Sequence, residues 1–291
     1  KYRNAIESYE LAIASYPSLA EVYQFLGESY KNLYKPGDES PENLHRADKA
    51  LEALTKAMEF FPTNKTVIAS LADMYDRLGR FDDAEKLYLK ILEMEPNNMN
   101  NYYVVAQFYR TYASGAEEEK KDELGNVIKT PFKKAEEMYL RRIELDPDNP
   151  EGYAYAAEFY DKVTPPIFDK ANYFHKMQLK FDPNNAIIWY SIGVNRNWKA
   201  FRLQNVLSRE EREEAALEGE KALLKAIELD PSFPEAPLYL NILYRNVFVG
   251  LYPEKEDRYV AEADKWQARS DEVRKKALER KRLEEELRGR R

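Results

Sequence analysis

The chain has no cysteine among its 291 residues and only two histidines. Without cysteine it has no disulfide, no thiol nucleophile and no thiolate metal site. We expect His45 in a loop and His175 at a core-facing helix position, too far apart in the sequence pattern to share a metal or a substrate. Glycine-rich phosphate loops, nucleophile elbows and histidine-containing zinc motifs are also missing. We therefore predict a protein that is not an enzyme and holds no metal and no cofactor.

Long apolar runs and an excess of basic charge are missing as well. No apolar stretch approaches the roughly 18 residues that a membrane-spanning helix needs. The 52 acidic and 45 basic side chains are interspersed, and the one basic concentration, Lys276 to Arg291, also carries glutamates, so nucleic acid is not an expected partner. A chain without disulfides suits the cytosol as well as a secreted, periplasmic or extracellular location, so the compartment stays open.

Six prolines divide the chain into segments that each contain two amphipathic stretches. They are Pro17, Pro62, Pro96, Pro147, Pro183 and Pro231, with intervals of 45, 34, 51, 36 and 48 residues. Between Lys65 and Asn98, apolar or small side chains recur at three- and four-residue spacing on both sides of Gly79: Ile68, Leu71, Ala72 and Tyr75, then Ala84, Tyr88 and Ile91. This periodicity predicts an internal repeat of helix, turn and helix.

The repeat resembles the tetratricopeptide repeat family, here of a bacterial type. In that family a bulky residue, Leu, a small residue and Tyr mark the first helix, and small, aromatic, small and Pro mark the second. The other segments match to varying degrees: His175 and Gln178 replace an aromatic and a small residue, and Arg196 stands where Tyr is usual. The resemblance implies an all-α, right-handed superhelical solenoid of stacked antiparallel helix pairs.

On this basis we divide the chain into one solenoid, residues 1–279, and a charged helical tail, residues 280–291. The solenoid comprises a half repeat 1–19, repeats 20–64, 65–98, 99–149, 150–185 and 186–233, and a last unit 234–279 with a long C-terminal capping helix. Insertions fall inside repeats, at Lys35 to Asn43, Gly115 to Pro131 and Trp198 to Ser208. The second contains the charge run Glu117 to Asp122. Such loops on one edge either build a binding face or mark where the stack tolerates insertion, and the apolar content of the third is expected to be buried.

Helix-capping patterns agree with the repeat. Ser18 with Glu21 and Ser232 with Glu235 have capping-box spacing, and Asn149 precedes a proline suited to a first turn. Asn64 begins an Asn-Lys-Thr glycosylation acceptor pattern, but we prefer a role as the cap of the following helix.

In the resembled family the first helices line a concave groove, and helical spacing gives the outward positions. In the early and middle repeats they are Glu21, Gln24, Glu28, Lys31, Asp73, Asp76, Tyr103, Gln107 and Arg110. In the later repeats they are Glu158, Asp161, Ile187, Tyr190, Val194, Asn197, Leu238, Ile242 and Arg245. The groove is therefore expected to change from acidic to apolar along the chain.

These positions favour one kind of ligand. Family members that hold the acidic C-terminal tails of chaperones use a basic and amide clamp where this chain has Gln24 and Glu28, so a carboxylate ligand would be repelled. We predict a protein or peptide partner with a basic or apolar segment. The apolar strip from Ile187 to Ile242 either grips such a segment or is filled by the chain's own loop or last helix.

The half repeat suggests a second function. Ala5, Tyr9 and Ala12 lie in register on a second helix whose first helix is absent from the sequence. Either that helix was removed, or another molecule covers the apolar face, and head-to-tail contact between identical molecules then generates a filament. We therefore keep two hypotheses: a non-catalytic interaction scaffold, and a self-assembling structural subunit of an extracellular or envelope filament.

Overall fold

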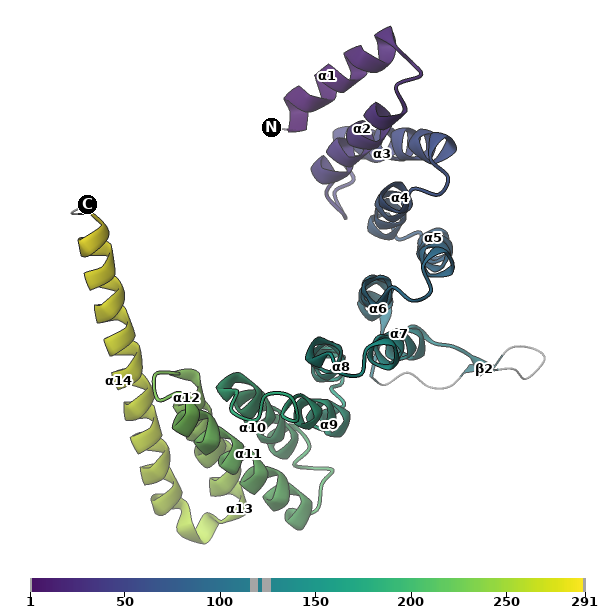
Figure 1. The fold of residues 1–291 in the computed structure, drawn as a ribbon. Helices are drawn as coiled ribbons and strands as arrows, with labels where there is room; N and C mark the ends of the chain where they lie inside the picture. The colour runs from purple at the N-terminus through teal and green to yellow at the C-terminus, as the bar shows by residue number, and fades with distance from the viewer. Residues whose placement is uncertain (1, 116–119, 122–126, 290–291) are drawn as a thin grey trace. The chain divides into compact units, whose positions relative to one another are not determined.

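The computed structural model describes residues 2–115, 120–121 and 127–289 (Figure 1). The regular secondary structure of the described chain is helical apart from β1 (Lys120–Lys121) and β2 (Val127–Ile128), two short antiparallel strands that pair Lys120 with Ile128. The all-α array of helix pairs is thus confirmed. Most of the charge run at 117–122 lies outside the described residues. The chain divides into two compact units, Lys1–Thr111 and Tyr112–Arg291, and each is described by itself.

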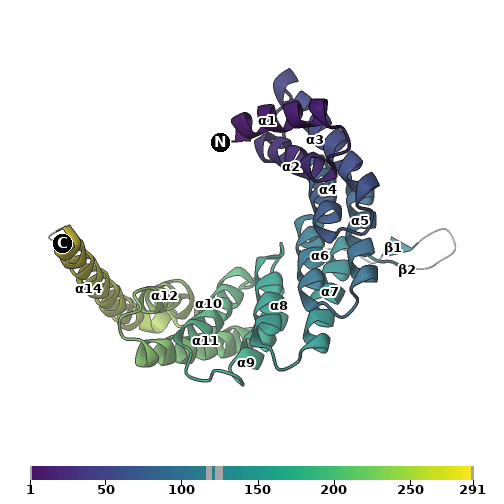
Figure 2. The same cartoon turned by 45° about the horizontal axis from the view of Figure 1, so that its top comes forward.

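The first unit is a row of antiparallel helices. They are α1 (Tyr2–Ser15), α2 (Ala20–Leu33), α3 (Pro41–Phe60), α4 (Lys65–Arg77), α5 (Phe81–Met94) and α6 (Met99–Tyr112). From α1 to α5 each helix packs on the next (Figure 2). Leu26, Leu54 and Met74 are buried in the core that α2, α3 and α4 share, as expected from the helical spacing of their apolar residues.

The second unit continues the same pattern. Its helices begin, in chain order, with α7 (Pro131–Leu145), α8 (Pro150–Lys162), α9 (Phe168–Gln178), α10 (Ala186–Arg202), α11 (Arg209–Leu229) and α12 (Glu235–Leu243). Each packs on the next along the chain. Ala216, Leu223, Leu240 and Leu243 form the buried core between α10, α11 and α12.

The chain ends in a long helix that lies along α12. After α12 come a π-helical turn, η1 (Tyr244–Phe248), the short α13 (Val249–Leu251) and a 3-10 turn, η2 (Pro253–Lys255). Then α14 (Glu256–Gly289) packs antiparallel to α12 and continues beyond it (Figure 1). Ala263, Ser270 and Val273 are buried, whereas every side chain from Arg274 to Arg288 is exposed. The second part of α14 therefore has no contact that buries it within the described chain.

All six of the dividing prolines lie in turns between successive helices, and four of these turns share a hydrogen bond. In each of the four, an aromatic side chain six residues later donates to the proline carbonyl. The pairs are Tyr23 to Pro17 (3.1 Å), Tyr102 to Pro96 (2.9 Å), Tyr153 to Pro147 (2.8 Å) and Trp189 to Pro183 (2.8 Å). These three tyrosines and Trp189 therefore join consecutive helix pairs through hydrogen bonds as well as through packing.

Two glycines let helices approach more closely than any other residue would allow. A Cβ on Gly27 of α2 would lie 2.6 Å from Cγ of Leu54 in α3, and one on Gly193 of α10 would lie 2.5 Å from Cγ of Leu223 in α11. Both distances are shorter than a carbon–carbon contact permits, so the spacing of α2 with α3 and of α10 with α11 depends on glycine.

The helix caps confirm some of the predicted residues and contradict others. Asn64 accepts hydrogen bonds from the backbone N–H groups of Thr66 and Val67, and Asn149 caps α8. Neither predicted capping box forms, because Leu19 and Pro234 occupy the N-cap positions of α2 and α12. The hydroxyl of Ser232 donates instead to the carboxylate of Asp230. The capping box that does form joins Ser208 and Glu211 at the start of α11.

Four local expectations were wrong. His45 lies on α3 and not in a loop, because that helix begins at Pro41. Trp198 belongs to α10, which continues to Arg202, so the third insertion is shorter than predicted. Its Val206 is 78% exposed, contrary to the expected burial. The side chain of Asn197 points into the structure and is buried, because its amide donates to the carbonyl of Tyr239.

Candidate functional site

The first helices of the predicted repeats form a surface that we call the first-helix face. In the first unit this face carries polar side chains that bind one another. Glu28 accepts hydrogen bonds from Gln24 of its own helix (3.3 Å) and from Ser70 of α4 (2.9 Å). Asp73 pairs with Lys31 of α2 (2.8 Å) and with Arg77 (3.0 Å). The two cations offset the charge of Asp73, so this face is less acidic than its carboxylates alone suggested.

The other predicted groove residues of the first unit have intermediate exposure. Glu21 is exposed, and the remaining four are half-buried: Asp76, Tyr103, Gln107 and Arg110. The three predicted self-association residues, Ala5, Tyr9 and Ala12, are half-buried as well. Tyr9 stacks on Phe25 of α2, with ring centroids 6.1 Å apart, so α2 covers part of that face.

The predicted apolar strip lies on the first-helix face of the second unit. Ile187 on α10 is 65% exposed, while Tyr190, Val194, Leu238 and Ile242 are half-buried. The ring of Tyr190 packs edge-on against Phe233 and Tyr239, with centroids 4.8 and 5.5 Å away, and burial raises the pKa of its phenol. The chain's own aromatic rings therefore fill part of the strip, one of the two alternatives that the sequence left open.

Beside Tyr190 the same face contains a cavity of about 260 Å³. We call it the α8–α10 cavity. Asp161 from α8, Pro166, Phe168, Tyr190, Ser191, Val194, Asn195, Trp198 and Arg202 line it. Three predicted groove residues, Asp161, Tyr190 and Val194, thus belong to a defined hollow. Glu158, one turn before Asp161, instead pairs with Lys162 at 2.7 Å.

A buried polar network holds Asp161 at the wall of this cavity. One carboxylate oxygen of Asp161 lies 2.8 Å from Nε2 of His175, and the other accepts from the amide of Asn195 at 2.6 Å. Arg196 donates to the amide oxygen of Asn195 from Nε (2.8 Å) and Nη2 (2.6 Å). His175, Asn195 and Arg196 are all less than a tenth exposed. The carboxylate is therefore fixed in position by groups that cannot reorient freely.

The network extends from Arg196 to the far side of α9. The guanidinium donates to Asp169 (2.9 Å) and to the carbonyl of Phe168 (2.7 Å), and Lys199 also binds Asp169 at 2.7 Å. Burial would raise the pKa of Asp169, but Lys199 and Arg196 outweigh it and hold that pKa below its ordinary value. The carboxylate of Asp169 at Nη1 and the neutral amide of Asn195 at Nε thus anchor the arginine at opposite ends of its planar group.

The chemistry of this site is that of binding and positioning. Both ring nitrogens of His175 are engaged, one by Asp161 and the other by the amide of Gln178 at 3.3 Å. The hydroxyl of Ser191 donates to the carbonyl of Ile187. No imidazole nitrogen is therefore directed at a nucleophile in the cavity. In the part of the chain that the structure describes, no group of three or more His, Asp or Glu side chains could hold a metal ion.

The sequence contained a signal for this network. His175, Gln178 and Arg196 were the departures from the repeat pattern, and all three belong to it. Their polar side chains occupy positions where the pattern expects apolar or small residues. The identity of their partners could not be predicted, because Asp161 and Asn195 lie on different helices, α8 and α10.

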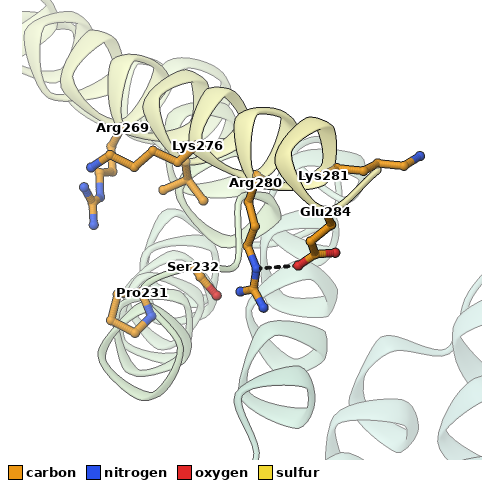
Figure 3. A pocket seen from close by; sticks show the side chains of 9 residues that line it. Pro231, Ser232, Arg269, Lys276, Arg280, Lys281 and Glu284 are labelled. Atoms are coloured by element: carbon orange, nitrogen blue, oxygen red, sulfur yellow. Dashed lines mark hydrogen bonds and ion pairs between the residues drawn. The ribbon is translucent and has the colours of Figure 1, made fainter. Parts of the chain in front are cut away.

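A second hollow, of about 550 Å³, lies beside the exposed part of α14. Figure 3 shows Arg269, Lys276 and Arg280 on that helix beside Pro231 and Ser232 of the turn between α11 and α12, whereas the side chain of Lys281 points away from them. Its cations have carboxylate partners one turn away, such as Arg280 with Glu284 at 3.0 Å. Such exposed pairs leave little net field, so the hollow offers a weaker basis for recognition than the α8–α10 cavity.

Comparison with known proteins identifies the repeat. The tetratricopeptide repeat family model matches residues 44–107. Tetratricopeptide repeat protein 8 of Caenorhabditis elegans is 25% identical over 181 residues, 60% of this chain and 29% of the relative. Human protein O-mannosyl-transferase TMTC3 is 23% identical over 167 residues, 53% of this chain and 16% of the relative. The chain thus spans less than a third of the length of either relative.

Solved structures show the same fold over nearly the whole chain. The crystal structure of the C-terminal part of a TPR repeat-containing protein from Cytophaga hutchinsonii has a TM-score of 0.61 and 13% sequence identity. The match covers 96% of this chain and 93% of that one. Among the helices that the structure describes, none is both long and apolar enough to cross a membrane.

Proposed function

The chain is a tetratricopeptide repeat protein, and on that premise we propose that it is a non-catalytic scaffold that binds a protein or peptide through its first-helix faces and edge loops. The observation that carries this proposal is the α8–α10 cavity. It lies on a face that has the groove positions of the repeat, and Tyr190 and Val194 contribute to it. A cavity with apolar walls and a few fixed polar groups is typical of a recognition site.

The polar groups of the cavity support a binding role over a catalytic one. Asp161, His175 and Asn195 are bonded to each other, so their hydrogen-bonding capacity serves to fix one carboxylate. The mannosyl-transferase name belongs to a relative of which this chain spans 16%. We propose that the partner presents a basic or apolar segment, as the groove positions predict.

Selection from a library of random dodecapeptides, followed by calorimetry, tests the proposal. Val194→Trp fills the cavity without adding charge, and we expect it to weaken the selected peptides by about tenfold or more. The control is Leu217→Trp, which places the same side chain on α11, the second helix of its predicted repeat. Leu217 is 48% exposed there. If no peptide binds the unaltered chain, or if both variants bind alike, the scaffold proposal is wrong.

Self-assembly is the second candidate, and exposed apolar side chains near the start of the chain favour it. Leu11 is 70% exposed, Tyr16 66% and Phe25 49%, all on α1, α2 or the turn between them. We propose that Ala5, Tyr9 and Ala12 border the contact and that a head-to-tail neighbour covers these side chains. Light scattering over a hundredfold concentration range tests this. A concentration-independent monomer contradicts it, and Leu11→Lys should abolish any assembly.

A further inference from the structure

The α8–α10 cavity has an uneven distribution of charge. Its wall contains one carboxylate, that of Asp161, whose side chain is 29% exposed. The two partners of that carboxylate, Asn195 and His175, are polar groups that give it hydrogen bonds. No ion pair joins Asp161 to a lysine or arginine within the described residues. When His175 is neutral, the carboxylate therefore presents a negative charge that these hydrogen bonds hold but do not cancel, whereas a protonated His175 would pair with it.

The remaining walls suit a cation with an aliphatic stem. Phe168, Tyr190 and Trp198 present aromatic rings, and Val194 adds an apolar contact. Aromatic faces attract cations through their quadrupole, and the methylene groups of lysine or arginine pack against apolar walls while the charged end reaches a polar partner. The volume of about 260 Å³ matches one such side chain and not a folded element.

Arg202 adds a movable positive charge at the same cavity. It is exposed, and its guanidinium lies over the ring of Trp198, 4.7 Å from the centroid. This arrangement shows that a cation already uses one aromatic wall. A ligand cation would share the cavity with Arg202 and would be repelled by it.

We propose that the α8–α10 cavity receives a lysine or arginine side chain of the partner segment, with Asp161 as the counter-ion and Arg202 as a competing charge that limits affinity. The inference deepens the proposed scaffold function and depends on it. It assigns opposite effects to two residues of one cavity. Loss of Asp161 should weaken a cationic ligand, and loss of Arg202 should strengthen it.

Fluorescence anisotropy with two labelled peptides, (Ala-Lys)6 and (Ala-Glu)6, tests this at about 0.15 M salt, where distant charges are screened. We expect Asp161→Asn to weaken (Ala-Lys)6 by about tenfold, since a charge-assisted hydrogen bond is lost. Arg202→Gln should tighten it by about threefold. Asp257→Asn and Arg274→Gln make the same charge changes at exposed positions of α14 and should alter Kd by less than about twofold.

The outcomes separate this inference from the scaffold proposal. Because Asp161→Asn could disturb the buried network, Arg202→Glu provides a second variant, and it should tighten (Ala-Lys)6 further without touching that network. If (Ala-Glu)6 binds more tightly than (Ala-Lys)6, and Arg202→Gln weakens the binding of (Ala-Glu)6, then the cavity recognises anions and the inference is wrong. If Asp161→Asn and Asp257→Asn act alike, only overall charge matters. Library peptides that bind independently of Asp161 overturn this inference alone, whereas the absence of any bound peptide overturns both proposals.

Discussion

Replacement of the buried Arg196 by methionine should destabilise the second unit by about 2–4 kcal/mol. The guanidinium satisfies two buried acceptors, the amide oxygen of Asn195 and the carbonyl of Phe168. Each buried acceptor that loses its donor costs about 1–3 kcal/mol, and the apolar side chain recovers part of the sum. The third acceptor, Asp169, is 70% exposed and can be hydrated instead, so its loss adds little.

Urea unfolding followed by tryptophan fluorescence measures this effect where it occurs. The three tryptophans, Trp189, Trp198 and Trp266, all belong to the unit that contains Arg196. Arg202→Met on the same helix is the control, since it removes an exposed arginine and, with it, the contact over the ring of Trp198, and should change stability by less than about 1 kcal/mol. Asn195→Leu combined with Arg196→Met removes this donor and acceptor together. Asp161 then also loses the amide of Asn195 and the carbonyl of Phe168 stays unpaired, so we expect a cost that is large but below the sum of the two single changes.

The result that refutes the reasoning is a small effect. If Arg196→Met costs less than about 0.5 kcal/mol, or no more than Arg202→Met, then the network does not depend on the arginine. The buried hydrogen bonds would then have little influence on stability.

Three further perturbations test other parts of the fold. Asn64→Ala should cost about 1 kcal/mol in urea unfolding monitored by circular dichroism, because the cap of α4 is lost, and an unchanged midpoint would contradict that role. Gly193→Ala should destabilise by about 1–3 kcal/mol despite the better helix propensity of alanine, since its methyl group meets Leu223, whereas a stabilised variant would show that α10 and α11 can separate. Burial would raise the pKa of Glu136, but hydrogen bonds from Lys133, Lys170 and Tyr160 outweigh it and lower that pKa. The contribution of Glu136 to stability is therefore complete above the ordinary value of 4.5 and is lost as pH falls through the lowered one, so Glu136→Gln should flatten the dependence of stability on pH below 4.5.

The repeat pattern made the fold predictable from the sequence, because helix pairs bury residues at a fixed spacing. The prolines marked the turns, and Asn64 and Asn149 marked two helix starts by local chemistry that one segment contains. The predicted caps at Ser18 and Ser232 were wrong, because the helices start one or two residues further along the chain. The division into repeats and the groove positions stay predictions.

The site was only half predictable. Tyr190 and Val194 followed from helical spacing on one helix. The position of Asp161 against Asn195 and His175 depends on how α8, α9 and α10 pack, which no spacing within one helix determines. Likewise, ideal helical periodicity places Asn197 on the outward face, but its side chain is buried. The carbonyl of Tyr239 on α12 lies close enough to accept a hydrogen bond from its amide.

The bond from an aromatic side chain to a proline carbonyl implies that the junctions between helix pairs are of two chemical kinds. At Pro17, Pro96, Pro147 and Pro183 a phenol or an indole closes the junction, and phenylalanine could not replace either. Six residues after Pro62 and Pro231 stand Ile68 and Pro237, which have no side-chain donor. Those two junctions lack this bond. At Pro62 the carbonyl accepts instead from Nζ of Lys90 (2.8 Å), in an exposed contact, so amide hydrogen exchange should detect local opening at both before it does at the other four.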